Sequence, residues 1–122
     1  MSAGPLDSWD KVMDFALGLP GTVATTSWGG PAVAVEANGR AFLYPGREQD
    51  TSFALAIDLD TIEMLKATEP ETYWQSPHYE GWPAVLVRVD SPDPERVRET
   101  IARALDQAAA KKPVRRRKKG PA

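Results

Sequence analysis

A single histidine, His78, offers the widest choice of chemistry in this chain of 122 residues. Ser76 and Glu80 lie two positions before and after it, so the three side chains have the types of a nucleophile, a base and an orienting acid. A catalytic triad, however, is defined by geometry in the folded protein and not by proximity in sequence. The chain has no second histidine and no cysteine, which excludes histidine-pair metal sites, Cys-based zinc sites and thiol nucleophiles. We therefore interpret His78 as a loop residue and expect no enzyme activity, metal or cofactor.

Two other patterns also have a structural interpretation. Asp58 and Asp60 could bind a cation or transfer protons, but both positions suit the start of a helix, where acids cap backbone N–H groups. Gly29-Gly30-Pro31 is followed by residues typical of a strand, whereas a phosphate-binding loop needs Gly-Lys-Ser/Thr and a helix. We expect helix capping at the first site and a turn at the second.

Aromatic residues are a stronger indication of binding. Three of the four tryptophans flank predicted turns and strand ends, where an indole can pack on one side and remain open on the other. Such rings stack on nucleobases or ligands, or they pack at the rim of a core. Together with neighbouring polar and basic side chains they define a candidate ligand or partner face, made of Trp28, Arg40, Trp74, His78, Tyr79, Trp82 and Arg88.

The charge is divided unevenly along the chain. The formal net charge is −2, from 15 basic and 17 acidic residues. Positions 111–122 contain seven bases and no acid, so residues 1–110 carry the other eight bases against all 17 acids, a charge of −9. A basic segment of this kind does not fold alone and can bind phosphates without reading sequence. The candidate nucleic-acid-binding residues are Lys111, Lys112, Arg115, Arg116, Arg117, Lys118 and Lys119.

The same segment has other possible roles: a solvated extension, or a contact with anionic lipid or with a protein. No apolar run approaches the ~20 residues of a membrane span, and the first ten residues lack the pattern of a signal peptide. We therefore predict a cytoplasmic protein with no membrane association, in which a monomer is favoured. It has one domain, residues 1–110, and a disordered basic tail, residues 111–122.

Periodicity predicts the elements that position these residues. Apolar spacing of three and four predicts helices that begin near Asp7 or Ser8, near Asp60 and after Asp93. Alternation predicts strands around 32–36, 41–44, 53–58 and 83–89, with a two-residue type I′ turn at Asn38-Gly39 and an irregular aromatic segment over 71–82. The order is one helix, three or four strands, a helix, one or two strands and a helix. It indicates an α+β fold with an antiparallel sheet of about five strands and helices on one face.

The parity of the strands separates two faces of this sheet. One face, the expected core, collects Val33, Val35, Phe53, Leu55, Ile57, Val85, Val87 and Val89. The other is rich in small residues and collects Ala32, Ala34, Glu36, Ala54, Ala56, Ala84, Leu86 and Arg88. Alanine there either forms a shallow binding face for a ligand, partner or second copy, or lets a helix approach closely.

Several motifs in order resemble the MmcQ/YjbR family: Leu19-Pro20-Gly21 after the first helix, Trp28-Gly29-x-Pro31, Phe42, Tyr79 and Gly81-Trp82. The resemblance covers about Trp9 to Leu105. It implies a two-layer α+β domain similar in layout to type III secretion chaperones, DNA binding through a double-wing arrangement, and no established catalytic residues. Family members usually carry bases between the second helix and the last strand, where this chain has the acidic-to-neutral segment 71–76, so we expect any DNA contact at the tail.

Overall fold

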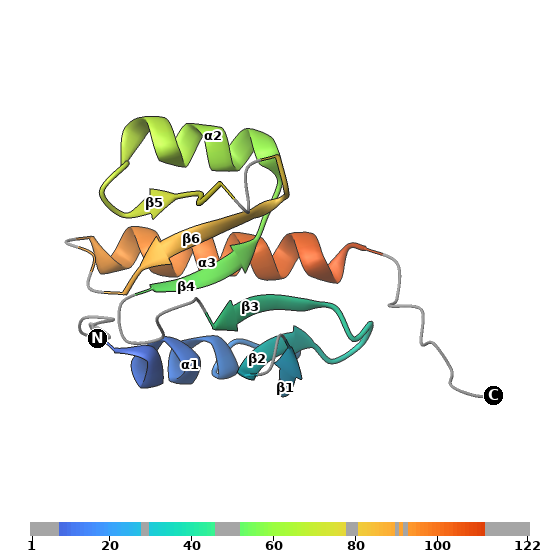
Figure 1. The fold of residues 1–122 in the computed structure, drawn as a ribbon. Coiled ribbons are helices and arrows are strands. Elements are labelled where there is room, and N and C mark those ends of the chain that lie inside the picture. The colour runs from blue at the N-terminus through green and yellow to red at the C-terminus, as the bar shows by residue number, and fades with distance from the viewer. Residues whose placement is uncertain are drawn as a thin grey trace.

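The computed structural model describes residues 8–27, 30–45, 52–77, 81–89, 91 and 93–111. These residues form three helices and six strands (Figure 1). In chain order the elements are α1 (Trp9–Leu17), β1 (Thr22–Ser27), β2 (Gly30–Val35), β3 (Ala41–Pro45), β4 (Ser52–Ala56), α2 (Leu59–Thr68), β5 (Tyr73–Trp74), β6 (Ala84–Arg88) and α3 (Pro94–Ala109). The predicted order of elements is confirmed. There are six strands instead of about five, because two strands are added to the four ranges given by alternation: β1, and the short β5 in the segment expected to be irregular.

Each helix begins at a side-chain cap. Ser8 accepts a hydrogen bond from the N–H of Lys11 at 3.2 Å at the start of α1. At the start of α2 the side chain of Asp58 accepts from the N–H of Thr61. At the start of α3 the side chain of Asp93 accepts from the N–H of Arg96, and Pro94 occupies the first helical position. The capping interpretation of Asp58 is therefore confirmed. None of the described helices is long and apolar enough to cross a membrane.

The six strands form one antiparallel sheet in the order β1-β2-β3-β4-β6-β5. All three helices pack on one of its faces. Their buried side chains belong to the same core cluster as the valine-bearing face of the sheet, and they are Val12, Ala16, Ile62, Leu65, Val97, Ile101, Ala104, Leu105 and Ala108. The predicted core face and the α+β fold are thereby confirmed.

The hairpin between β2 and β3 differs from the prediction in two ways. Residues 36–39 form a four-residue loop, closed by hydrogen bonds of 2.8 Å from the N–H of Val35 to the carbonyl of Arg40 and from the N–H of Gly39 to the carbonyl of Val35. The two-residue type I′ turn is therefore wrong, although Gly39 does have a positive φ of 73°. A register shift in the β2–β3 pair also interrupts the alternation, and both Phe42 and Leu43 enter the core.

The second face of the sheet carries small side chains between large rings. Tyr44, Ala54, Leu86 and Trp74 lie directly opposite one another across β3, β4, β6 and β5. Ala32, Ala34 and Ala54 are buried, whereas Ala56 and Ala84 are half-buried and Arg88 is exposed. Since the described helices all pack on the opposite face, alanine does not serve helix approach here. Among the described residues this face is open at Arg88 on β6 and, at its other side, at Val23 and Thr25 on β1, which lie opposite Ala34 and Ala32.

Candidate functional site

The C-terminal end of α3 is tied to the turn between β2 and β3. The side-chain amide of Asn38 donates hydrogen bonds to the carbonyl oxygens of Ala108 at 2.8 Å and Lys111 at 3.1 Å. Its Oδ1 accepts from the N–H of Arg40 at 3.0 Å. The carbonyl of Ala108 lies in the last turn of α3, where it also accepts from the N–H of Lys111 at 3.2 Å, so Asn38 adds a side-chain contact to a backbone turn at the end of the helix. The chain therefore leaves α3 from a defined point beside the β2–β3 turn.

The predicted basic tail begins at this point. Lys111 is exposed directly after α3, and it belongs to the described part of the chain. The other six candidate nucleic-acid-binding residues lie outside the described residues: Lys112, Arg115, Arg116, Arg117, Lys118 and Lys119. Of the predicted tail, the structure therefore describes only the first residue.

The residues of the predicted ligand face that the structure describes are divided among separate places. Trp74 on β5 and Arg88 on β6 share the second face of the sheet, whereas Trp82 precedes β6 at its other end. Arg40 directly precedes β3, and β4 and β6 separate β3 from β5. At the usual strand spacing this is about 14 Å across the sheet. The remaining three lie outside the described residues: Trp28, His78 and Tyr79.

Trp82 is the most open aromatic side chain in the described part of the molecule, with 65% of its surface exposed. The backbone around it is nevertheless held in place. The amide of Gln75 donates hydrogen bonds to the carbonyl oxygens of Trp82 at 3.0 Å and Ala84 at 2.9 Å. The ammonium group of Lys66 donates to the amide oxygen of Gln75 at 3.0 Å. An exposed ring on a fixed backbone can stack on a flat ligand.

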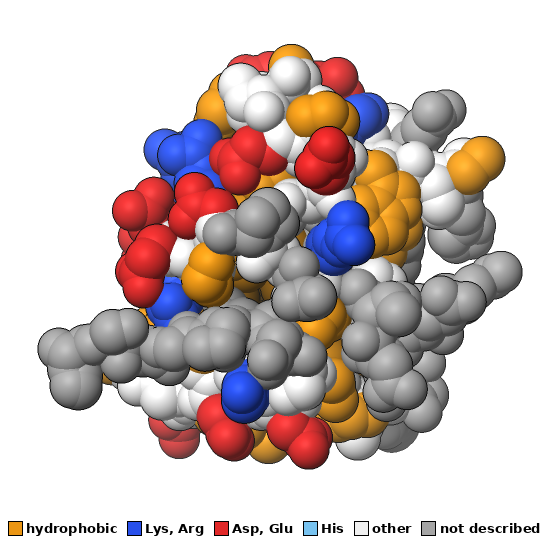
Figure 2. Space-filling model, turned by 90° about the vertical axis from the view of Figure 1, so that its left-hand side faces the viewer, with side chains coloured by type: hydrophobic (Ala, Val, Ile, Leu, Met, Phe, Trp, Pro, Cys, Tyr) orange, Lys and Arg blue, Asp and Glu red, His pale blue; other side chains and the backbone are white. Residues whose placement is uncertain are grey.

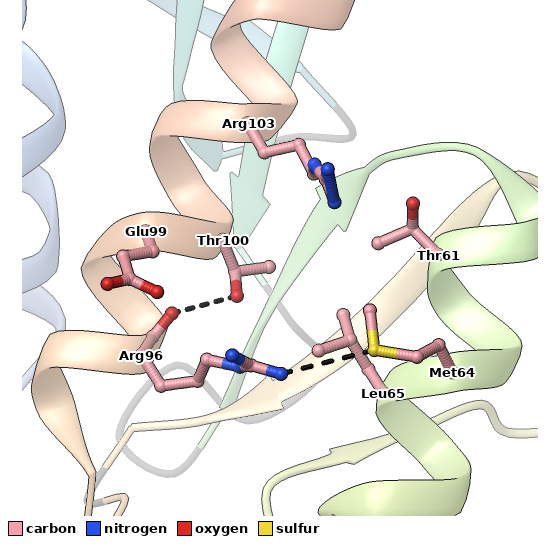
Figure 3. A pocket seen from close by; sticks show the side chains of 7 residues that line it. All are labelled: Thr61, Met64, Leu65, Arg96, Glu99, Thr100 and Arg103. Carbon is pink, nitrogen blue, oxygen red and sulfur yellow. Dashed lines mark hydrogen bonds between the residues drawn. The ribbon is translucent and has the colours of Figure 1, made fainter.

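A groove between α2 and α3 was not predicted from the sequence (Figure 3). Its volume is about 220 Å³, and its lining residues are Thr61, Met64, Leu65, Arg96, Glu99, Thr100 and Arg103. Arg96 and Arg103 are seven residues apart and so lie on one face of α3, two turns from each other. Arg103 points across the groove toward Thr61. The spacing of the arginines is visible in the sequence, but nothing there shows that α2 lies opposite them.

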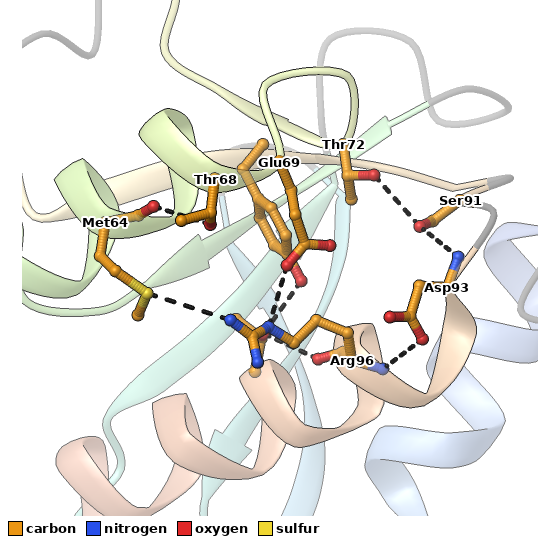
Figure 4. Close-up of polar contacts among 9 residues, drawn as sticks. Met64, Thr68, Glu69, Thr72, Ser91, Asp93 and Arg96 are labelled. Carbon is orange, nitrogen blue, oxygen red and sulfur yellow. Dashed lines mark hydrogen bonds and ion pairs between the residues drawn. The ribbon is translucent and has the colours of Figure 1, made fainter.

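Arg96 is the centre of a polar network at one end of this groove (Figure 4). Its Nε lies 3.0 Å from the carboxylate of Glu69, and its Nη2 lies 3.9 Å from the sulfur of Met64. Arg96 is paired with Glu69, and the lining also contains Glu99 and Arg103, so the formal charges of these four side chains sum to zero. The groove therefore has no net charge to favour an anion or a cation.

Two shifted pKa values identify structural groups. The hydroxyl of Thr61 donates to the Asp58 carboxylate at 2.7 Å and outweighs partial burial, so the pKa of Asp58 falls to about 2. Burial raises the pKa of Tyr73 to about 12, and its hydroxyl pairs with that of Thr100 at 2.9 Å. At neutral pH Asp58 stays ionised and Tyr73 stays protonated, so neither exchanges protons as a general acid or base does. Among the described residues, no group of three or more His, Asp or Glu side chains could hold a metal ion.

Several basic side chains of the domain are neutralised by acids. The ion pairs are Lys66–Glu63 at 3.3 Å, Arg96–Glu69 at 3.0 Å and Arg98–Glu95 at 2.7 Å. Figure 2 shows acidic and basic side chains interspersed on one face, with no continuous basic patch among the coloured residues. Binding along a phosphate backbone requires several cations that remain available to phosphate. The described surface in this view offers no such track.

These features define an α+β domain with one antiparallel sheet, helices on one of its faces, and a basic sequence directly after the last helix. A protein-family model, YjbR, matches residues 17–107, and the chain belongs to this family. The resemblance to MmcQ/YjbR proteins is thereby confirmed. The match runs from the last residue of α1 almost to the end of α3, so the basic tail lies outside it. No curated protein and no solved structure matched the chain.

Proposed function

We propose that this YjbR-family chain is a non-enzymatic, cytoplasmic protein that contacts nucleic acid mainly through Lys111–Lys119. The observation that carries the proposal is the run of seven bases without an acid after α3, at the point that Asn38 ties to the domain. Such contacts bind phosphate and do not specify sequence. The absence of cysteine supports a reducing compartment.

The charge of the domain supports the tail as the main contact. Residues 1–110 carry a formal charge of −9, which repels a phosphate backbone. The ion pairs of Lys66, Arg96 and Arg98 further reduce the cations available to phosphate. A non-enzymatic role is supported by the structural use of Asp58 and Tyr73, whose pKa values lie far from neutrality.

The proposal predicts a steep salt dependence of DNA binding. If all seven tail bases displace counterions from duplex DNA, log K falls against log salt with a slope of about −6. In the full chain, replacing Arg115, Arg116 and Arg117 by glutamine leaves four tail bases and reduces the slope to about −4. Fluorescence anisotropy of a labelled duplex, measured from about 50 to about 300 mM NaCl, gives both slopes.

A matched control removes three bases from the domain instead. Lys66→Gln, Arg88→Gln and Arg103→Gln together change the net charge of the chain by the same amount as the tail variant. We expect this control to retain the steep slope. If the two triple variants lose affinity and slope equally, the tail has no special role, and if the wild-type chain does not bind DNA at low salt, the proposal is wrong.

The exposed ring of Trp82 favours a second candidate function, binding of a flat ligand at the rim formed by β5 and β6. In this case a short oligo(dT) quenches tryptophan fluorescence at 0.5 M NaCl, where phosphate contacts are weak. The quenching is lost in Trp82→Ala and retained in the tail variant. Unchanged fluorescence of the wild-type chain at this salt concentration rules out oligonucleotide stacking at this rim.

A further inference from the structure

One end of the molecule is built from a segment without charge. Although 26% of the residues are charged, none lies between Asp14 and Glu36. This segment includes the C-terminal end of α1, all of β1 and all of β2. It also contains two of the exposed large apolar side chains, Leu17 at 39% and Val23 at 40% exposure. Depletion of charge together with exposed apolar side chains is typical of the centre of a protein–protein interface.

The strand β1 forms the edge of the sheet at this end, and its register shows which backbone groups face outward. The N–H of Glu36 donates to the carbonyl of Gly21 at 2.8 Å, so residues at odd positions along β1 exchange hydrogen bonds with β2. The N–H and C=O groups of Thr22, Ala24 and Thr26 therefore point away from the sheet. The edge presents three consecutive sets of donors and acceptors at the spacing of a strand.

This edge lacks the features that usually prevent pairing with another strand. Natural edges are interrupted by charged residues, proline or a bulge, or they are very short. β1 contains no charged residue and no proline, and it pairs with β2 over six consecutive residues without a shift. The side chains of Val23, Ala24, Thr25 and Thr26 are all exposed. The opposite edge, β5, has two residues and is protected by its length.

We propose that β1 pairs antiparallel with β1 of a second copy of this chain, so that a dimer replaces the monomer favoured by the sequence alone. A second copy fits this edge because β1 carries no charge, so two copies of the acidic domain can meet here without placing like charges against each other. The register follows from the outward groups. With Ala24 opposite Ala24 on the twofold axis and Thr22 opposite Thr26, all three sets of donors and acceptors find partners. The dimer then has one continuous sheet, and Val23 on β1 lies at its centre.

Sedimentation equilibrium of the full chain, free of nucleic acid, tests this proposal. We expect a reversible equilibrium between the 13.3 kDa monomer and a dimer. Raising NaCl from about 0.1 to 0.5 M leaves the dimer equally stable or more so, because its interface contains no ion pairs. A purely monomeric chain up to several hundred micromolar overturns the proposal. The absence of DNA separates this result from the test of the basic tail.

Three substitutions at Ala24 test the interface: two that should weaken the dimer and one control at the same position. Ala24→Pro removes an N–H that faces away from β2, so the β1–β2 hydrogen bonds remain and dimerisation weakens at least tenfold. Ala24→Lys keeps that N–H but places two like charges opposite each other, with the same result. Ala24→Ser, the control, dimerises as the wild type does. Thermal unfolding monitored by circular dichroism confirms that each variant is folded, and equal dimerisation of the Lys and Ser variants would contradict this interface.

The register can be tested separately because the chain contains no cysteine. Directly opposed residues in a hydrogen-bonded antiparallel pair have Cα atoms about 5.5 Å apart, within the range that a disulfide spans. Ala24→Cys should therefore form a covalent dimer under mild oxidation. Ala109→Cys, exposed at the end of α3, is the control and should crosslink slowly. Equal rates of crosslinking at the two positions would show random collision and overturn the register.

Discussion

At the β5 end of the sheet polar side chains satisfy one another, whereas at the β1 end backbone groups face solvent. Tyr73 on β5 is buried and bonded to Thr100, and Arg96 is paired with Glu69 close by. β1 has no charged side chain, and three of its residues direct their N–H and C=O groups outward. At the β5 end, polar side chains find their hydrogen-bond partners within one chain. At the β1 end, the outward N–H and C=O groups must bond to water or to another strand.

The comparison implies different sensitivities to mutation. At the β5 end, stability depends on individual side chains that connect β5, α2 and α3. At the β1 end, it depends on the backbone ladder between β1 and β2, which most side-chain substitutions leave intact. Single substitutions should therefore be costly at one end and mild at the other.

The largest expected effect is that of Tyr73→Ala, which removes a fully buried ring. The loss of packing should reduce the free energy of unfolding by roughly 3 to 5 kcal/mol. Thr25→Ala, on the exposed side of β1, should cost less than about 1 kcal/mol. Urea denaturation followed by circular dichroism measures both. Similar losses for the two variants would abolish the distinction between the ends.

Tyr73 also shows where prediction from the sequence fails. The core face of β2, β4 and β6 was predicted because alternation persists over five or six residues in each strand. β5 has two residues, too few to show a period, so its buried ring was assigned to an irregular segment. The sequence also does not show which strand forms an edge, because that depends on pairing between segments far apart.

The next largest effect is expected at Asn38, where the β2–β3 turn holds the end of α3. Asn38→Ala removes hydrogen bonds to the carbonyls of Ala108, in α3, and Lys111, just after it, and one from the N–H of Arg40, and should cost about 1 to 2 kcal/mol. Asn38→Asp keeps the acceptor for Arg40 but brings a negative charge to the C-terminal end of a helix, so it should be at least as destabilising. Thermal unfolding compares the two. A stable Asp variant would show that the amide donors contribute nothing.

The candidate sites were predictable to different extents. The basic tail is visible in the sequence as a run of charge, and its residues after Lys111 lie outside the described part of the chain. The ligand face was assembled from residues that flank turns, and the structure separates Arg40 from Trp74 because β4 and β6 lie between their strands. The groove beside Arg103 depends on the packing of α2 against α3, which no local pattern encodes.

A smaller effect that depends on pH is expected at Asp58. Its pKa is about 2 in the folded protein and 3.8 ordinarily, so its ionised form stabilises the fold fully above pH 3.8, and this contribution is lost as the pH falls through 2. Asp58→Ala should cost about 1 kcal/mol at pH 7 through loss of the helix cap. Asp58→Asn keeps a capping oxygen and should lose less stability than the wild type between pH 4 and 2, in urea denaturation at a series of pH values. An unchanged pH dependence in the Asn variant would show that other carboxyl groups dominate this range.

The smallest effect is expected for the ion pair between Arg96 and Glu69, although it is prominent at the β5 end. Both side chains are partly exposed, at 36% and 25%, so solvent screens their attraction and the pair should contribute at most about 0.5 kcal/mol. A double-mutant cycle with Glu69→Gln and Arg96→Gln measures the coupling between them, which should vanish in 1 M NaCl. A salt-resistant coupling above 1 kcal/mol would mean that charge stabilises this end as buried packing does. In that case the β1 end would be the less stable of the two simply because it lacks charged pairs. Its outward-facing N–H and C=O groups would then not be needed to explain the difference.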